Sequence, residues 1–173
     1  MNRLFFVTLA SAVIAVGCSN DNNSPTNPSQ AQPTFTADLR ASNEVPPVAN
    51  AESSGTGNVT VTFDVARDAG GNITSATATF VVNVSNFPAG TTLNIAHIHE
   101  APAGATGTIV VNTTLTPGQT ALTNGAASFT KSGIAVTPEV AQRILNNPAG
   151  FYFNIHSTLN PGGVIRGQLV RVQ

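Results

Sequence analysis

From residue 34 onward, apolar and polar residues alternate along much of the chain. Val59, Val61 and Phe63, for example, share one side of an extended segment, while Thr60 and Thr62 occupy the other. This period of two is typical of a β-strand with one buried face. Clusters of Gly, Pro, Asn and Asp separate the successive segments. The pattern predicts strands at residues 35–39, 59–65, 76–84, 93–99, 107–112, 126–130, 151–156 and 164–172.

A single helix is predicted after the sixth strand. Thr137 is suited to cap its N-terminus, Pro138 to occupy the first helical position, and Glu139 to complement the helix dipole. Residues 146–148, Asn-Asn-Pro, are expected to end it. Its apolar face is then made by three residues: Val140, Ile144 and Leu145.

About eight short strands with one short helix predict an all-β fold at residues 34–173, either an immunoglobulin-like sandwich or a barrel. Within this fold Phe80 and Phe153 lie on the apolar sides of their strands. We therefore expect both rings in the hydrophobic core.

The composition narrows the class of protein. Charged residues make up only 9% of the 173 residues, against roughly 25% in an average soluble domain. Apolar residues make up 41%, which excludes a disordered acidic chain. The formal net charge is −1, and Lys and Arg form no cluster. Nucleic acid is therefore not expected as a partner, because phosphate binding requires grouped positive charges.

The pattern of the N-terminal segment predicts an export signal. Arg3 precedes an apolar run at 4–16, which is shorter than the roughly 20 residues of a membrane span and fits the central part of a signal peptide. Cys18 is the only cysteine, and it follows small residues in a segment that resembles a bacterial lipobox. The resemblance implies a lipoprotein signal peptide at 1–17, cleavage before Cys18, and acylation of the Cys18 thiol.

Residues 18–33 are rich in Asn, Ser and Pro and predict a flexible tether between the lipid and the domain. We expect the chain to be held by its lipid in the bacterial cell envelope, outside the cytoplasm. Ser19, which follows the cysteine, favours the outer membrane by resemblance to signals of enteric bacteria. Ala15 stands where a lipobox usually has Leu, so a plain secretory signal and a membrane anchor remain alternatives.

Three segments of the domain resemble a known family. In order and spacing they resemble the motifs of the CHRD domain, a module named after chordin and common in secreted bacterial proteins. Val164 replaces a usual Glu, and Ser157 a usual Thr. The resemblance implies an immunoglobulin-like barrel, distantly similar to copper/zinc superoxide dismutases, with no defined biochemical activity. The segments are LRASNEVPPVANAESSGTG at 39–57, AHIHEAPAGATGTIVV at 96–111 and FYFNIHSTLNPGGVIRGQL at 151–169.

All three histidines of the chain lie within these motifs. His97 and His99 are two residues apart on a predicted strand and therefore share a face, opposite to Ile98. On the strand at 151–156, Ile155 points inward, so His156 points outward. If the two strands are neighbours, the three imidazoles converge on the outer face. Neutral imidazole suits copper and zinc, and three histidines with one open position form a known type of metal site.

Two other interpretations of the histidines stay open. They form a polar cluster with Glu100 and Arg166, or one of them acts in catalysis. A metal site is expected to lose affinity below about pH 6, because imidazole binds metals only when neutral and its unperturbed pKa is about 6.5. The His-x-His pair resembles the copper site of the dismutases, but no histidine is left for a second metal, and dismutase activity is not expected.

A second group of motif residues is predicted to be structural. Arg166 lies in an apolar strand between glycines, where a guanidinium usually holds a carboxylate or loop carbonyls. Its candidate partners are Glu44 and Glu100. Pro46 and Pro47 fix an extended bend after Glu44. The alternative for Arg166 is direct binding of a ligand.

No signature of catalysis accompanies these residues. The sequence has no Gly-x-Ser-x-Gly elbow, no nucleotide-binding loop and no cysteine at 34–173. We therefore expect a non-enzymatic β domain on a bacterial envelope, which binds or supports an envelope component or an extracellular protein. The alternative function is a copper- or zinc-binding module with weak redox activity.

Overall fold

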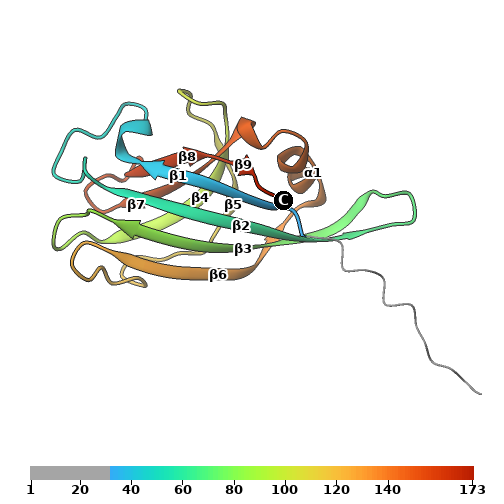
Figure 1. The fold of residues 1–173 in the computed structure, drawn as a ribbon, viewed down its shortest axis with the longest axis horizontal. Helices are drawn as coiled ribbons and strands as arrows, with labels where there is room; N and C mark the ends of the chain where they lie inside the picture. The colour runs from blue at the N-terminus through green and yellow to red at the C-terminus, as the bar shows by residue number, and fades with distance from the viewer. Residues whose placement is uncertain (1–31) are drawn as a thin grey trace, which may run out of the picture. The chain divides into compact units, whose positions relative to one another are not determined.

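The alternating segments form nine strands, and one α-helix follows the sixth, in the computed structural model, which describes residues 32–173 (Figure 1). The predicted signal peptide at 1–17 and Cys18 lie outside the described residues. Within residues 32–173 no helix combines the length and hydrophobicity of a membrane span. The strands are β1 (Thr34–Arg40), β2 (Thr56–Arg67), β3 (Ile73–Ser85), β4 (Leu93–Glu100), β5 (Thr108–Asn112), β6 (Ala127–Val136), β7 (Phe151–Ser157), β8 (Ile165–Gln168) and β9 (Val170–Arg171).

The strands form one antiparallel sheet in the order β5-β4-β7-β8-β1-β2-β3-β6, and β9 pairs with β1. Residues of the edge strands β5 and β6 come within 8 Å of each other, so the sheet curls into a nearly closed barrel. In Figure 1, β1, β2, β3 and β6 form the nearer layer, with β4, β5, β7 and β8 behind it. The predicted all-β fold is confirmed.

Most predicted strands differ from the observed ones by at most three residues at an end, and two differ more. The sixth continues to Val136, because a bulge interrupts its alternation: Lys131 pairs with Phe80, but Ile134 already pairs with Ala78. The extra residue of β6 interrupts the period of two, so the sequence pattern does not predict the part of the strand beyond the bulge. The eighth predicted strand is divided into β8, which pairs with β7, and β9, which pairs with β1.

The helix α1 (Pro138–Asn146) begins and ends as predicted. Thr137 Oγ1 accepts a hydrogen bond from the amide of Val140, which satisfies a donor of the first turn. Ile144 and Leu145 are buried against the sheet, and Val140 is only partly covered. Short 3₁₀ turns at Ala41–Asn43 and Pro148–Gly150 connect neighbouring elements.

The core lies between the two layers of the barrel. Phe80 on β3 and Phe153 on β7 are fully buried, and their rings stack with centroids 5.7 Å apart. Phe35 and Phe63 make an edge-to-face pair in the same core, also at 5.7 Å. The predicted core positions of Phe80 and Phe153 are confirmed.

Candidate functional site

The three histidines lie together on the outer side of β4 and β7. These strands are neighbours, with His97 opposite Asn154, His99 opposite Tyr152, and His156 opposite Ile95. One ring nitrogen from each histidine lies within 4.8 Å of the others. The centroid of the His97 ring is 5.6 Å from that of His99 and 5.2 Å from that of His156. Strand parity and pairing thus bring the three imidazoles to one point.

The outer face that carries the histidines is buried, although the sequence pattern predicts a polar surface there. His97, His99 and His156 are only 2%, 9% and 7% exposed. Loops cover them: the backbone of Gly107, between β4 and β5, contacts His99, and that of Pro161, between β7 and β8, contacts His156. Alternation distinguishes the two faces of a strand, but it does not show what a loop places over them.

Backbone carbonyls set the proton positions on two of the rings. His99 Nδ1 is 3.0 Å from the carbonyl oxygen of Gly107, and His156 Nδ1 is 2.8 Å from that of Pro161. Because a carbonyl only accepts, each Nδ1 must carry the proton, and each Nε2 of a neutral ring presents a lone pair. Both Nε2 atoms, and Nδ1 of His97, are buried without any hydrogen-bond partner.

The surroundings keep all three imidazoles neutral. Burial lowers the pKa of His97 to about 4, and repulsion from His156 and His99 acts in the same direction. Burial also lowers the pKa of His99 and His156, although the hydrogen bonds to Gly107 and Pro161 oppose it. Protons therefore compete for these nitrogens only in more acidic solution than the pH of about 6 expected for an unperturbed imidazole.

Asn154 connects the histidines to a buried ion pair. It lies between His97 on β4 and Arg166 on β8 in one row across the sheet. Its Nδ2 donates to Glu44 Oε1 at 2.8 Å, and Glu44 Oε2 is 4.0 Å from Arg166 Nε. Burial raises the pKa of Glu44 to about 7, although Arg166 and the Asn154 hydrogen bond lower it. Glu44 is thus one of the two partners predicted for Arg166.

The other predicted partner, Glu100, does not reach Arg166. Its two carboxylate oxygens accept hydrogen bonds from Nε and Nη2 of Arg143, on α1, at 3.2 and 3.0 Å. Glu100 is the last residue of β4 and lies at the helix end of the barrel, outside the histidine cluster. The prediction that links Glu100 to Arg166 is wrong, because nothing in the sequence indicates that α1 packs beside the end of β4.

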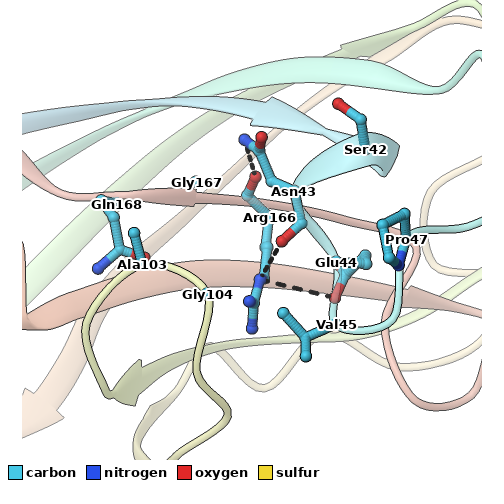
Figure 2. A pocket seen from close by; sticks show the side chains of 10 residues that line it. All are labelled: Ser42, Asn43, Glu44, Val45, Pro47, Ala103, Gly104, Arg166, Gly167 and Gln168. Carbon is cyan, nitrogen blue, oxygen red and sulfur yellow. Dashed lines mark hydrogen bonds and ion pairs between the residues drawn. The ribbon is translucent and has the colours of Figure 1, made fainter.

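Arg166 holds two loops in place. Its Nε donates to the carbonyl of Asn43 at 2.6 Å, and its Nη1 to that of Ala105 at 3.0 Å (Figure 2 shows the Asn43 contact). The guanidinium carbon lies 4.5 Å from the centre of the Tyr152 ring, and the His99 ring stacks on Tyr152 at 4.8 Å. The role predicted for Arg166, a clamp on loop carbonyls, agrees with these contacts.

The residues of this site lie within a segment that matches a known protein family. The family model of the CHRD domain matches residues 35–169. The chain belongs to the CHRD domain family. No curated protein and no solved structure matches the chain. The match covers the three histidines, Glu44 and Arg166, and it suggests a β domain with a binding or structural role.

The proline motif of the CHRD domain follows the buried Glu44, which ends the polar row of His97, Asn154 and Arg166. The Val45–Pro46 peptide bond is cis, and Pro46 and Pro47 are exposed. Val45 separates them from Glu44, so the chain passes from the buried Glu44, which accepts a hydrogen bond from Asn154, to three exposed residues. The predicted bend thus lies beside the buried polar row.

Tyr152 and Glu52 are two further buried polar residues of the CHRD domain for which the sequence predicts no role. Tyr152 lies four residues before His156 on β7, so alternation along the strand predicts that both side chains share one face. The pairing of β4 with β7 then brings Tyr152 opposite His99. Glu52 is 2% exposed and accepts hydrogen bonds from Ser157 Oγ and, at 2.6 Å, from Asn160 Nδ2. It holds the loop that follows β7, and its position in a segment without alternation gives no sequence signal.

The three histidines could hold a transition-metal ion. Each ring has one buried nitrogen without a hydrogen-bond partner, and the lowered pKa of each ring favours its neutral form. Imidazole nitrogens are suitable ligands for copper and zinc, and three of them leave one coordination position for water or another ligand. The hydrogen bonds from Nδ1 of His99 and His156 to carbonyls are the kind of support that orients metal-binding imidazoles.

Proposed function

We propose that this CHRD domain binds one copper or zinc ion through His97, His99 and His156. The observation that carries the proposal is the convergence, within 4.8 Å, of one ring nitrogen from each of three buried histidines. Both Nε2 of His99 and His156 and the Nδ1 of His97 lack a hydrogen-bond partner. A single ion would satisfy the cluster.

The alternative is a polar cluster that only supports the loops. That arrangement leaves three buried ring nitrogens unpaired, and each unsatisfied buried group costs about 1–3 kcal/mol. A cluster evolved for stability alone would be expected to pair these atoms with one another or with the loops. The loops do contact His99 and His156, but only through the nitrogens that already carry protons.

Calorimetric titration of the purified chain tests the metal site. At pH 7.5 we expect one equivalent of copper(II) or zinc(II) to bind, copper more tightly, in line with the usual order of divalent affinities. His97→Ala and His156→Ala should each weaken binding strongly. Asn58→Ala, at an exposed polar position on β2, is the matched control and should bind as the wild type does. Absence of saturable one-to-one binding, or unchanged binding by both histidine variants, would leave the cluster a structural one.

We further propose that a lipid on Cys18 holds the domain in the outer membrane, outside the cytoplasm, where it meets envelope components or extracellular proteins. The lipobox-like segment before Cys18 supports this proposal. Cys18→Ser should abolish labelling of the chain by palmitate and release the domain from membranes or leave an uncleaved precursor. Labelled palmitate on the Cys18→Ser variant would contradict it.

The proposed role is binding and not catalysis. The sequence supports this through its lack of a nucleophile elbow, a nucleotide loop and any cysteine at 34–173. Nucleic acid is not proposed as a partner, since a net charge of −1 without a cluster of Lys and Arg gives no attraction for phosphates.

A further inference from the structure

Unpaired polar atoms gather in one part of the described domain. Six buried side-chain nitrogen or oxygen atoms of residues 32–173 lack a hydrogen-bond partner. Three are the histidine nitrogens, and two more are Asn154 Oδ1 and Arg166 Nη2, on the same outer side of β7 and β8. A metal ion at the histidines explains the first three atoms but gives Arg166 Nη2 no partner.

Arg166 forms part of the lining of a cavity of about 520 Å³. This volume is within the range of about 300–1,000 Å³ that small-molecule sites usually have. Figure 2 shows the guanidinium between the Glu44–Pro47 segment on one side and the loop at Ala103 and Gly104 on the other. The cavity therefore has a cationic group at its base and residues of two loops as its walls.

The walls of this cavity are mainly apolar. Val45 and Pro47 stand on one side and Ala103 on the other, and all three are exposed. Val45 is 42% exposed, which is high for a valine and places an apolar side chain in contact with solvent at the cavity. A ligand with a charged end and a short apolar part would match both the base and the walls.

The charge at the base is only partly balanced. The distance of 4.0 Å between Arg166 Nε and Glu44 Oε2 is at the limit for an ion pair. Arg166 directs Nε and Nη1 to the carbonyls of Asn43 and Ala105, which are neutral acceptors. Since burial raises the pKa of Glu44 to about 7, the carboxyl is protonated in a large fraction of molecules at neutral pH. The guanidinium then retains positive charge for an incoming anion.

We propose that this cavity binds a carboxylate with a short aliphatic substituent, which accepts a hydrogen bond from Arg166 Nη2 while its apolar part contacts Val45, Pro47 and Ala103. The site is separate from the three histidines and does not depend on a metal ion. Free organic acids and the C-terminal carboxylate of a peptide share this chemistry. The apolar walls disfavour small inorganic anions, which would leave them uncovered.

Binding of isovalerate to the full chain, measured by calorimetry in the presence of a chelator, tests the proposal. Isovaleramide has the same shape without the charge and should bind at least about tenfold more weakly, because a charge-assisted hydrogen bond is lost. A tetrapeptide with a C-terminal valine, compared with its amide, distinguishes the sources. Tighter binding of the free peptide than of isovalerate indicates a chain end, and equal or weaker binding indicates a free acid.

Two variants keep the test decisive. Arg166→Lys should weaken isovalerate binding about tenfold, since Lys cannot reproduce the planar guanidinium. Because this change also loosens two loop contacts, Val45→Glu is the second variant: it leaves the buried network intact and adds a negative charge at the rim, which should abolish binding. Ile109→Glu, with the same charge change at an exposed position on β5 outside the cavity, should bind normally. Equal binding of acid and amide, no saturable binding, or normal binding by Val45→Glu would overturn the proposal.

Discussion

Strands β4 and β7 bury both of their faces, and the two faces are built in opposite ways. On the inner face, Ile98, Phe153 and Ile155 are fully buried among apolar side chains. On the outer face, His97 and Asn154 are almost as buried, at 2% each, but both carry a polar atom without a partner. Burial alone does not distinguish a core from a site. The inner face stabilises the barrel, whereas the outer face leaves buried polar atoms unpaired, which costs stability.

The largest contrast between the faces is expected on truncation. Phe153→Ala should lower the free energy of unfolding by about 3–5 kcal/mol, because it removes a stacked ring from a packed core. His97→Leu should change it by only about 1 kcal/mol, since an apolar group replaces an unpaired one. Urea denaturation of both variants without metal measures the two values. If His97→Leu lowered the free energy of unfolding as much as Phe153→Ala does, the outer face would stabilise the fold in the same way as the hydrophobic core.

Metal binding should offset the loss of stability that the unpaired polar atoms of the outer face cause. At a free copper concentration of about 100 times the dissociation constant, a ligand that binds only the folded state raises the free energy of unfolding by about 2.7 kcal/mol. We expect this gain for the wild type and for an inner-face control, Phe153→Leu, but not for His97→Leu. The comparison is made by urea denaturation with and without the ion. An equal gain for His97→Leu would place the binding elsewhere.

The free energy of unfolding is expected to depend on pH through Glu44, which contacts Asn154 on the outer face. Burial raises the pKa of Glu44 in the folded protein from 4.5 to about 7. The folded protein therefore keeps a proton that the unfolded chain has already lost, so this contribution is complete below about pH 4.5 and disappears as the pH rises through about 7. A rise of the pKa from 4.5 to about 7 corresponds to at most about 3.4 kcal/mol, and partial solvent screening of the carboxyl lowers this to the order of 2 kcal/mol.

Glu44→Gln isolates this effect. The free energy of unfolding of the wild type, minus that of the variant, should fall between pH 4.5 and pH 7.5. The lowered pKa values of the histidines act in the opposite direction, since their contribution is lost as the pH falls. Both proteins contain the histidines, so this second effect cancels in the difference. A difference that stays constant over the range would contradict the raised pKa of Glu44.

The smallest effect is expected one residue beyond His99. Glu100 and Arg143 form an ion pair in which both side chains are 38% exposed, and exposed pairs of this kind contribute about 0.2–1 kcal/mol. Glu100→Gln should therefore lower stability by at most about 1 kcal/mol and leave metal binding unchanged. Denaturation and titration of the same sample check both expectations. A large loss of metal affinity would extend the site to the end of β4.

The sequence predicts only part of the contrast between the two faces. Alternation around Ile98 and Ile155 predicts correctly that the histidines lie opposite the core. It cannot predict that Gly107 and Pro161 are folded over them, because loop positions depend on contacts between distant segments. For the same reason the sequence does not separate Glu44, which reaches Arg166, from Glu100, which binds the helix.

Tyr152 gives the protein a built-in optical probe. The chain has one tyrosine and no tryptophan, so its near-ultraviolet fluorescence comes from a single phenol ring. That ring stacks on His99 of the candidate metal site and lies under Arg166 of the carboxylate cavity. Copper(II) quenches nearby fluorophores, whereas zinc(II) does not quench in this way. Emission from the unlabelled chain therefore reports on both places at once, and its polarisation follows how firmly the covering loops hold the ring.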